Sequence, residues 1–199
     1  VYGIYNSGKS TLINVLMKKE VAAMADRPMT DRITEFDQGE YILVDSPGID
    51  APIEHEKVTN DFLNKCHIIL FVISSKGGFE SAYNYKKMAD LMQKGIPFVI
   101  VLNDRGCEIN PRWSLEKKTA QRRKHEQDLK DIQYKIIENL IRVTGDKNIT
   151  QKYEVYVLNA KKALTGIQKN KLQLYEASKV GVLDQRIIQL VQSSSALNI

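Results

Sequence analysis

Short runs of apolar residues alternate along the chain with longer stretches in which apolar side chains recur every three or four positions. The short runs, rich in Ile, Val and Phe, cover residues 41–45, 68–73, 97–102 and 154–158. The longer stretches cover residues 9–19, 56–65, 80–93 and 114–142. Apolar runs of the first kind are typical of buried parallel strands, and the second pattern predicts helices. We therefore expect an α/β fold with three layers, in which a mostly parallel sheet carries helices on both faces.

Between residues 104 and 150 the alternation is interrupted, and there we expect a long loop followed by a long helix. Gly106 and Pro111 mark the loop, and Gly145 fits the end of the helix. The apolar stripe of this helix consists of Leu129, Ile132, Ile136, Ile137, Leu140 and Ile141. A last amphipathic segment through Ile187 and Leu190 predicts a helix that covers the sheet, with a frayed tail over residues 193–199.

Composition agrees with one folded unit. A chain of 199 residues with 43% hydrophobic and 27% charged residues is the size of a single domain, which we expect to span residues 1–199. No apolar run approaches the roughly 20 residues of a membrane helix. Cys66 and Cys107 are expected to be free thiols in a reducing compartment, which favours a cytoplasmic location, with a peripheral membrane association as the alternative. The strand-like start at Val1 suggests a fragment of a longer chain.

A phosphate-binding motif stands at the beginning of the chain. Residues 3–10 read Gly-Ile-Tyr-Asn-Ser-Gly-Lys-Ser, which matches Gly-x-x-x-x-Gly-Lys-Ser/Thr. Gly3 and Gly8 let backbone amides converge on one oxyanion, and the following helix adds its positive dipole end. Lys9 supplies a charge to the outer phosphates, and Ser10 offers a hydroxyl to Mg²⁺. The predicted nucleotide-binding residues of this region are Gly3, Asn6, Ser7, Gly8, Lys9, Ser10 and Thr11.

A second motif, Asp45-Ser-Pro-Gly48, follows the apolar run 41–45. An Asp at the end of a buried strand can hold Mg²⁺ through a water molecule, and the Gly48 amide can reach the terminal phosphate. Alone, Asp-x-x-Gly is a common turn. After a phosphate-binding loop, it favours a nucleoside triphosphate site.

Together these two motifs resemble the GTPases of the translation-factor-related class. The stretch Gly-x-x-Asn-x-Gly-Lys-Ser-Thr-Leu-Ile-Asn is similar to the TrmE–Era branch and to bacterial dynamin-like GTPases. The resemblance implies a P-loop NTPase fold of the Ras-like G-domain type, a Mg²⁺-dependent GTPase that acts as a switch, and GTP and GDP as ligands. It also suggests a homodimer through the switch face, and contact with RNA, the ribosome or a membrane through the rest of the parent chain.

The resemblance further implies a threonine that binds Mg²⁺ and senses the terminal phosphate. Thr30, in a polar loop, is the preferred candidate, and Thr34 is interpreted as a strand residue. The position after Gly48, where some GTPases orient water with Gln, is Ile49, which cannot do so. Because Ile49 cannot orient water, we expect slow GTP hydrolysis, which K⁺ held at Asn6 or a partner would stimulate. The alternative is that Asn6 only stabilises the conformation of the loop. The predicted catalytic residues are Lys9, Thr30, Gly48 and Asn6.

Specificity for the base is the weakest part of the resemblance. The family motif Asn-Lys-x-Asp, whose Asp takes both donor groups of guanine, is here Asn103-Asp104-Arg105-Gly106. Either Asp104 or Glu108 replaces the missing carboxylate, or specificity is relaxed. After the last strand, residues 159–161 are similar to the family's Ser-Ala-Lys turn, which implies that Asn159, Ala160 and Lys161 line the base.

Other features are given less functional weight. The segment 116–124 carries five positive charges and one negative charge, and is interpreted as a solvated helix face rather than an RNA or membrane contact. His67 is expected in the core and His125 on the surface. The main alternative function is a module that binds nucleotide without hydrolysis, or without selecting the base.

Overall fold

A computed structural model describes residues 1–4, 6–19, 21–22, 33–46 and 62–196, with side chains to residue 193. The helices are α1 (Lys9–Leu16), α3 (Ala82–Gln93), α4 (Leu115–Thr144), α5 (Ile149–Lys152), α6 (Ala160–Gln168), α7 (Leu172–Glu176) and α8 (Val180–Ala196). The strands are β1 (Thr34–Asp37), β2 (Ile42–Asp45), β3 (Ile69–Ser74), β4 (Phe98–Asn103) and β5 (Val155–Leu158).

The centre of the fold is a parallel sheet in the order β3-β4-β5, in which Ile100 lies opposite both Phe71 and Val155. Tyr2 extends this sheet by pairing with Phe71 in parallel. All six residues of β3 and of β4 are buried, as expected for strands covered on both faces. The predicted strands at 68–73, 97–102 and 154–158 are therefore confirmed to within one residue at each end.

The strand predicted at 41–45 exists, but its predicted parallel pairing is wrong. β2 pairs antiparallel with β1, with Thr34 opposite Asp45 and Phe36 opposite Leu43. Its burial alternates and Ile42 is 60% exposed, because this hairpin has one face towards solvent. The Ser46 hydroxyl donates to the Val1 carbonyl at 3.0 Å, which holds the end of β2 beside the first residues of the chain.

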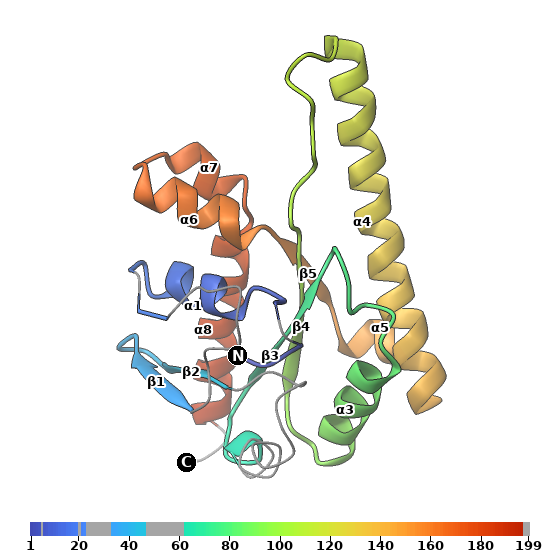
Figure 1. Cartoon of the computed structure of the whole chain (residues 1–199). Helices are drawn as coiled ribbons and strands as arrows, with labels where there is room; N and C mark the ends of the chain where they lie inside the picture. The colour runs from blue at the N-terminus through green and yellow to red at the C-terminus, as the bar shows by residue number, and fades with distance from the viewer. Residues whose placement is uncertain (5, 20, 23–32, 47–61, 197–199) are drawn as a thin grey trace.

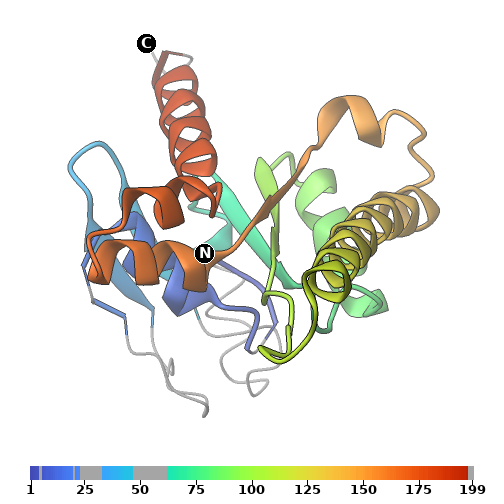
Figure 2. The ribbon, with the colours of Figure 1, turned by 90° about the horizontal axis from the view of Figure 1, so that it is seen from above.

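Two apolar clusters fill the space on the two faces of the parallel sheet, and the views in Figures 1 and 2 show the helices divided accordingly. One cluster joins Leu70, Val72, Val99 and Val101 of the sheet to α1, α6 and α8. The other joins the alternate positions Ile69, Phe71, Ile73, Ile100 and Leu102 to α3, α4 and α5. This is the three-layer α/β architecture that the sequence predicts.

The long helix is α4, and Gly145 ends it in the left-handed conformation with φ of 72°. Its predicted apolar stripe is confirmed, because Ile136 and Leu140 are fully buried and the other four members pack against them. The first half of α4 and the preceding loop extend beyond the rest of the molecule (Figure 1). Leu115, at the start of α4, is 76% exposed.

Three smaller expectations differ from the structure or lie outside it. His67 is exposed at the turn before β3 and is not a core residue. α8 continues to Ala196, so the predicted frayed tail is wrong for residues 193–196, and residues 197–199 lie outside the described residues. The predicted helix 56–65 lies largely outside the described residues. Within the described part of the chain, no helix has both the length and the apolar character needed to cross a membrane.

Candidate nucleotide-binding site

The loop of residues 3–10 runs from Tyr2, beside β3, into α1, and two of its positions accept only glycine. A Cβ on Gly3 would lie 2.2 Å from the Val72 carbonyl oxygen, and Gly3 has φ of 149°. Gly8, the N-cap of α1, has φ of 97°, and its Cβ would lie 2.1 Å from Asn103 Nδ2. The loop therefore fits closely against β3 and the end of β4 because these side chains are missing.

Lys9 is buried, and its amine lies across this loop. Lys9 Nζ donates to the carbonyl oxygens of Gly3 at 3.1 Å and Ile4 at 2.9 Å. The buried Ser7 hydroxyl makes no hydrogen bond to the described residues. A cationic amine, a helix N-terminus and a spare hydroxyl in one loop fit a phosphate group. Asn6 is exposed and has φ of 56°, a conformation that Asn tolerates better than most residues.

The residues predicted to hold Mg²⁺ are only partly described. Ser10 is half-buried in the first turn of α1, and Asp45 is buried at the carboxyl end of β2. Hydroxyl and carboxylate oxygens are the ligand types that Mg²⁺ prefers, so this donor set fits the ion. Thr30 and Gly48 lie outside the described residues. Thr34 is an exposed residue of β1, which confirms its interpretation as a strand residue.

Asn103 connects the phosphate-binding loop with the loop after β5. Its side chain is buried, and Nδ2 donates to the Ser7 carbonyl at 2.9 Å. Its Oδ1 accepts from the Ala160 amide at 3.1 Å. One side chain thus fixes three segments that are far apart in the sequence, and these are the segments to which the motifs assign the nucleotide.

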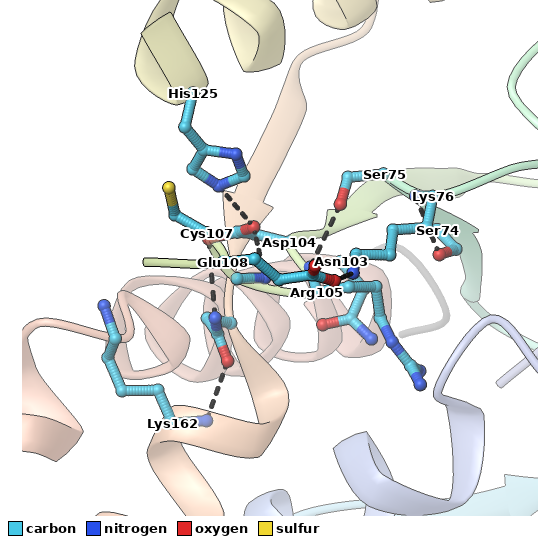
Figure 3. Close-up of polar contacts among 12 residues, drawn as sticks. Ser74, Ser75, Lys76, Asn103, Asp104, Arg105, Cys107, Glu108, His125 and Lys162 are labelled. Atoms are coloured by element: carbon cyan, nitrogen blue, oxygen red, sulfur yellow. Dashed lines mark hydrogen bonds and ion pairs between the residues drawn. The ribbon is translucent and has the colours of Figure 1, made fainter. Parts of the chain in front are cut away.

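Asp104 points away from the phosphate-binding loop into a cluster with α4 and the start of α6 (Figure 3). Asp104 Oδ1 accepts from the Gly106 amide at 2.7 Å and lies 2.9 Å from His125 Nε2. Asp104 Oδ2 lies 3.4 Å from Asn159 Nδ2. The side chain of Asp104 is 15% exposed and that of His125 is 23% exposed, so this cluster is largely shielded from water.

Arg105 and Glu108 face other partners. The Arg105 amide donates to Ser75 Oγ at 3.0 Å, and its guanidinium reaches the Asn6 carbonyl at 3.5 Å. Glu108 is exposed and pairs with Lys76 at 2.5 Å. The hydrogen bond from Lys76 lowers the pKa of the Glu108 carboxyl. Asp104 and Glu108, the two carboxylates considered as ligands of the base, therefore both have partners within the protein.

The segment after β5 forms the start of α6. Asn159 is the N-cap, and its Oδ1 accepts from the Lys162 amide at 2.7 Å. Ala160 is buried and Lys161 is exposed at the first turn. Thr11 is half-buried in α1. Of the predicted residues, the structure therefore gathers Ser7, Gly8, Asn103, Asp104, Asn159 and Ala160 at connected positions.

His125 and Arg105 are the residues of this region that the sequence analysis missed. His125 was expected on the surface, yet it reaches Asp104 from α4. A signal was available, because His125 continues the stripe of Leu129, Ile132 and Ile136 at helical spacing and therefore faces the body of the protein. Arg105 carried no such signal, since its position depends on the path of an irregular loop.

A glycine-rich loop entering a helix, an Asp at the end of the adjacent hairpin and an Asn bridging to the start of α6 define a P-loop nucleotide-binding domain of the G-domain type. Comparison with known families agrees: the model described as 50S ribosome-binding GTPase matches residues 1–104. The chain belongs to this GTPase family.

Curated relatives show the same similarity over part of their length. The chain is 31% identical to GTPase Der of Treponema pallidum over 116 residues, which are 52% of this chain and 25% of Der. It is 41% identical to GTPase Era of Fusobacterium nucleatum over 86 residues, which are 38% of this chain and 29% of Era. The chain thus spans between a quarter and a third of these two proteins.

Among solved structures, a probable GTP-binding protein engB superposes with a TM-score of 0.56 at 18% identity, covering 96% of this chain and 97% of that one. At this identity the similarity establishes the fold, and the predicted P-loop GTPase fold is confirmed.

Proposed function

We propose that this chain binds GTP and GDP with Mg²⁺ and hydrolyses GTP slowly, as a molecular switch. The observation that carries the proposal is the loop of residues 3–10, where a buried Lys9 amine spans the carbonyls of Gly3 and Ile4. The same amine can exchange these two carbonyls for phosphate oxygens, which bear more negative charge. The loop amides and the N-terminus of α1 favour the same anion.

The roles of the other residues follow from their chemistry. Mg²⁺, when bound, neutralises charge on the outer phosphates. Ser10 and Thr30 would hold the ion directly, and Asp45 would hold it through water. Asn103 keeps the loop in its binding shape through Ser7, and the Gly48 amide would donate to the terminal phosphate. Ile49 has no group to orient water, which supports slow intrinsic hydrolysis.

Stimulation is part of the same proposal. Asn6 is exposed, and its side-chain oxygen would be a ligand for K⁺. A cation there would stabilise negative charge that develops during phosphoryl transfer. A homodimer through the switch face is the alternative source of such a group.

The test is phosphate release from GTP at matched nucleotide occupancy, in K⁺ and in Na⁺, with binding of GDP and ADP measured by calorimetry. We expect GDP to bind, ADP to bind much more weakly, and hydrolysis to depend on Mg²⁺. Lys9→Ala should abolish both binding and hydrolysis. Asn6→Ala should remove the difference between K⁺ and Na⁺ while leaving GDP binding intact.

Binding without hydrolysis in either salt would favour the second candidate, a nucleotide-dependent interaction module. That candidate is motivated by Ile49 and by Gly106, where the residues of the family pattern are missing. Equal binding of GDP and ADP would contradict a guanine-nucleotide switch.

The proposal extends to the partner and the location of the parent protein. The family description names the 50S ribosome, which supports a ribosomal or RNA partner and a cytoplasmic location for the parent protein. Contact with a membrane through the rest of the parent chain is the alternative. Sucrose-gradient sedimentation with ribosomes, with and without a non-hydrolysable GTP analogue, would test the first of these.

A further inference from the structure

The first half of α4 and the loop before it form a projection, residues 108–124, whose end stands away from the rest of the molecule (Figure 1). Along α4, the first residue that packs against an apolar core cluster is Leu129. Leu115, the first residue of the helix, lies fourteen positions earlier, which is about 21 Å along a helix axis. The core therefore does not account for the side chains at the end of the projection.

Contacts within the projection fix the shape of its tip, residues 111–115. Ser114 is the N-cap of α4, and its hydroxyl accepts from the Lys117 amide at 3.3 Å. Lys118 Nζ donates to the Pro111 carbonyl at 2.7 Å and so ties the loop to the first turn of the helix. The tip is thus an ordered structure, held by bonds of its own.

This ordered tip presents apolar side chains to the solvent. Leu115 is 76% exposed and Trp113 is 37% exposed, and Pro111 is exposed beside them. Ile109, Pro111 and Trp113 also line an open hollow of about 610 Å³. Apolar side chains that gather at the end of a projection are typical of a surface that binds a partner.

The same segment carries a charge equal to that of the whole chain. Residues 112–124 contain six basic side chains and one acidic side chain, a net charge of +5, which is also the formal net charge of all 199 residues. The basic residues are Arg112, Lys117, Lys118, Arg122, Arg123 and Lys124. None of them forms an ion pair with a residue that the structure describes. The projection therefore attracts a partner that carries many negative charges.

An anionic lipid bilayer matches both properties of the projection. Its headgroups offer negative charge to the basic side chains, and the region just beneath them accepts apolar side chains such as Leu115. Trp113 suits this boundary as well, because an indole ring has a large apolar surface and one polar N–H group. The basic residues alone would fit a solvated helix face, and the exposed apolar tip is the observation that favours a membrane.

RNA matches only one of these properties. Its phosphates would attract the basic residues, but an aliphatic side chain such as Leu115 cannot stack on a base. The helical part of the projection, residues 115–124, contains no aromatic residue between its charges.

We propose that the tip of the projection binds the surface of an anionic phospholipid bilayer. Trp113 and Leu115 enter the boundary between headgroups and acyl chains, and the basic residues of α4 contact the headgroups. This contact goes beyond the proposed function, because it uses none of the residues assigned to the nucleotide and needs no bound nucleotide.

The first test uses the fluorescence of Trp113, which is the only tryptophan of the chain. The chain is titrated with vesicles of phosphatidylcholine, and with vesicles in which about one-quarter of the lipid is phosphatidylserine. We expect the emission to shift to shorter wavelength with the anionic vesicles, to be quenched by lipids brominated in the acyl chain, and to change little with phosphatidylcholine alone. An unchanged emission together with no flotation of the protein with the anionic vesicles would overturn the proposal.

The second test compares two exposed leucines. Leu172 is 69% exposed and is the first residue of α7, as Leu115 is the first residue of α4. Leu115→Ser should weaken binding to the anionic vesicles roughly tenfold, because it removes an apolar side chain from the bilayer. Leu172→Ser should leave binding unchanged, and thermal melting checks that both variants are folded. Equal affinities of the two variants would contradict insertion of the tip.

The third test reverses two charges. Arg123→Glu combined with Lys124→Glu should weaken binding to the anionic vesicles roughly tenfold or more and reduce its dependence on salt. Lys147→Glu combined with Lys169→Glu is the control, because it makes the same change in net charge at two exposed positions outside the projection. An equal loss in both double variants would mean that net charge, and not this projection, determines binding.

A parallel titration with a short single-stranded RNA distinguishes the other class of anionic partner. Binding of RNA that Leu115→Ser leaves unchanged, with no binding to the anionic vesicles, would assign the basic residues to RNA and overturn the proposal. None of these measurements requires GTP binding, so a failure of the proposed function would leave their outcome unaffected.

Discussion

The side-chain amide of Asn103 donates to the carbonyl of Ser7 at 2.9 Å, across 96 positions of sequence. The same side chain accepts from the Ala160 amide, so the end of β4 holds both the phosphate-binding loop and the start of α6. Because Ser7 and Ala160 are themselves fully buried, removing the Asn103 side chain would leave their carbonyl and amide without this partner inside the protein. This residue therefore contributes to the stability of the fold as well as to the shape of the site.

Asn103→Ala should destabilise the protein by about 2 kcal/mol or more, since it leaves a buried carbonyl and a buried amide unsatisfied. Asn103→Asp keeps the acceptor for Ala160 but loses the donor to Ser7, and should also weaken GDP binding. Urea denaturation without nucleotide measures the first effect, and calorimetry measures the second.

Asn148→Ala is the control for this pair, because Asn148 is exposed at the N-cap of α5 and its side chain makes no capping hydrogen bond. We expect it to change stability by less than about 0.5 kcal/mol. Equal effects of Asn103→Ala and Asn148→Ala would show that the bridge contributes nothing to folding.

Gly8 and Gly39 form a matched pair for the close fit of the phosphate-binding loop. Their φ values are 97° and 91°, so alanine at either position should cost about 1–2 kcal/mol in backbone conformation. A Cβ at Gly39 meets nothing within 4 Å, whereas at Gly8 it would meet Asn103 Nδ2 at 2.1 Å. Gly8→Ala should therefore be clearly more destabilising and should abolish GDP binding, while Gly39→Ala should bind GDP normally.

Equilibrium denaturation and GDP titration of the two variants measure this difference. Similar affinities for GDP in both would mean that Asn103 moves aside at little cost, and that the glycine is required only for its backbone conformation.

The sequence predicts the parallel core well because its signals are local. β3 and β4 are continuous apolar runs, and only a strand buried on both faces needs such a run. The pairing of β2 depends instead on β1, whose burial pattern is largely exposed and gives a weak signal. The antiparallel direction of this strand pair depends on contacts between residues far apart in the sequence. The run 41–45 alone therefore does not predict it.

The residues of the site also differ in how well the sequence predicts them. Gly3, Gly8 and Lys9 belong to one short motif whose spacing follows from the geometry of the loop, so the sequence identifies them directly. The contact between His125 and Asp104 joins a helix to a loop 21 positions away, and it depends on how α4 lies against the sheet. Such contacts follow from packing, which composition and spacing do not define.

Tyr41 joins the β1–β2 hairpin to α8, because its hydroxyl donates to Asp184 Oδ1 at 2.9 Å. Burial, followed by this hydrogen bond and the nearby carboxylate charge, raises the pKa of Tyr41 well above its usual value of about 10. Below pH 10 the hydroxyl is protonated in both the folded and the unfolded state. As pH rises above 10, the unfolded chain loses this proton first, so the free energy of unfolding should fall.

Tyr41→Phe should lower stability at pH 8 by about 1 kcal/mol, through the lost hydrogen bond, and should make the decline above pH 10 shallower. Urea denaturation at intervals from pH 8 to pH 11 measures both effects. Between pH 8 and 9 the two proteins should change in parallel. A decline above pH 10 that is equally steep in both would show that Tyr41 ionises alike in the folded and unfolded states.

Replacement of Gly166 or Gly181 by alanine should change the stability of the protein in opposite directions. Gly166 lies in α6, where a Cβ would be 2.7 Å from the Tyr175 backbone nitrogen and 3.1 Å from the Lys171 carbonyl oxygen. Because both neighbours are backbone atoms, α6 and α7 would have to separate. Gly166→Ala should therefore destabilise the protein by about 1–3 kcal/mol, despite the better helix propensity of alanine.

Gly181 lies in α8, and a Cβ there would make only an ordinary contact of 3.7 Å with Tyr175 Cε1. Gly181→Ala should stabilise the protein by about 0.5–1 kcal/mol, because alanine loses less backbone entropy than glycine when a helix forms. The urea midpoints of the two variants should move in opposite directions from that of the unmodified chain. A rise in both midpoints would mean that α7 shifts freely against α6, and that the close approach at Gly166 does not constrain the packing of the two helices.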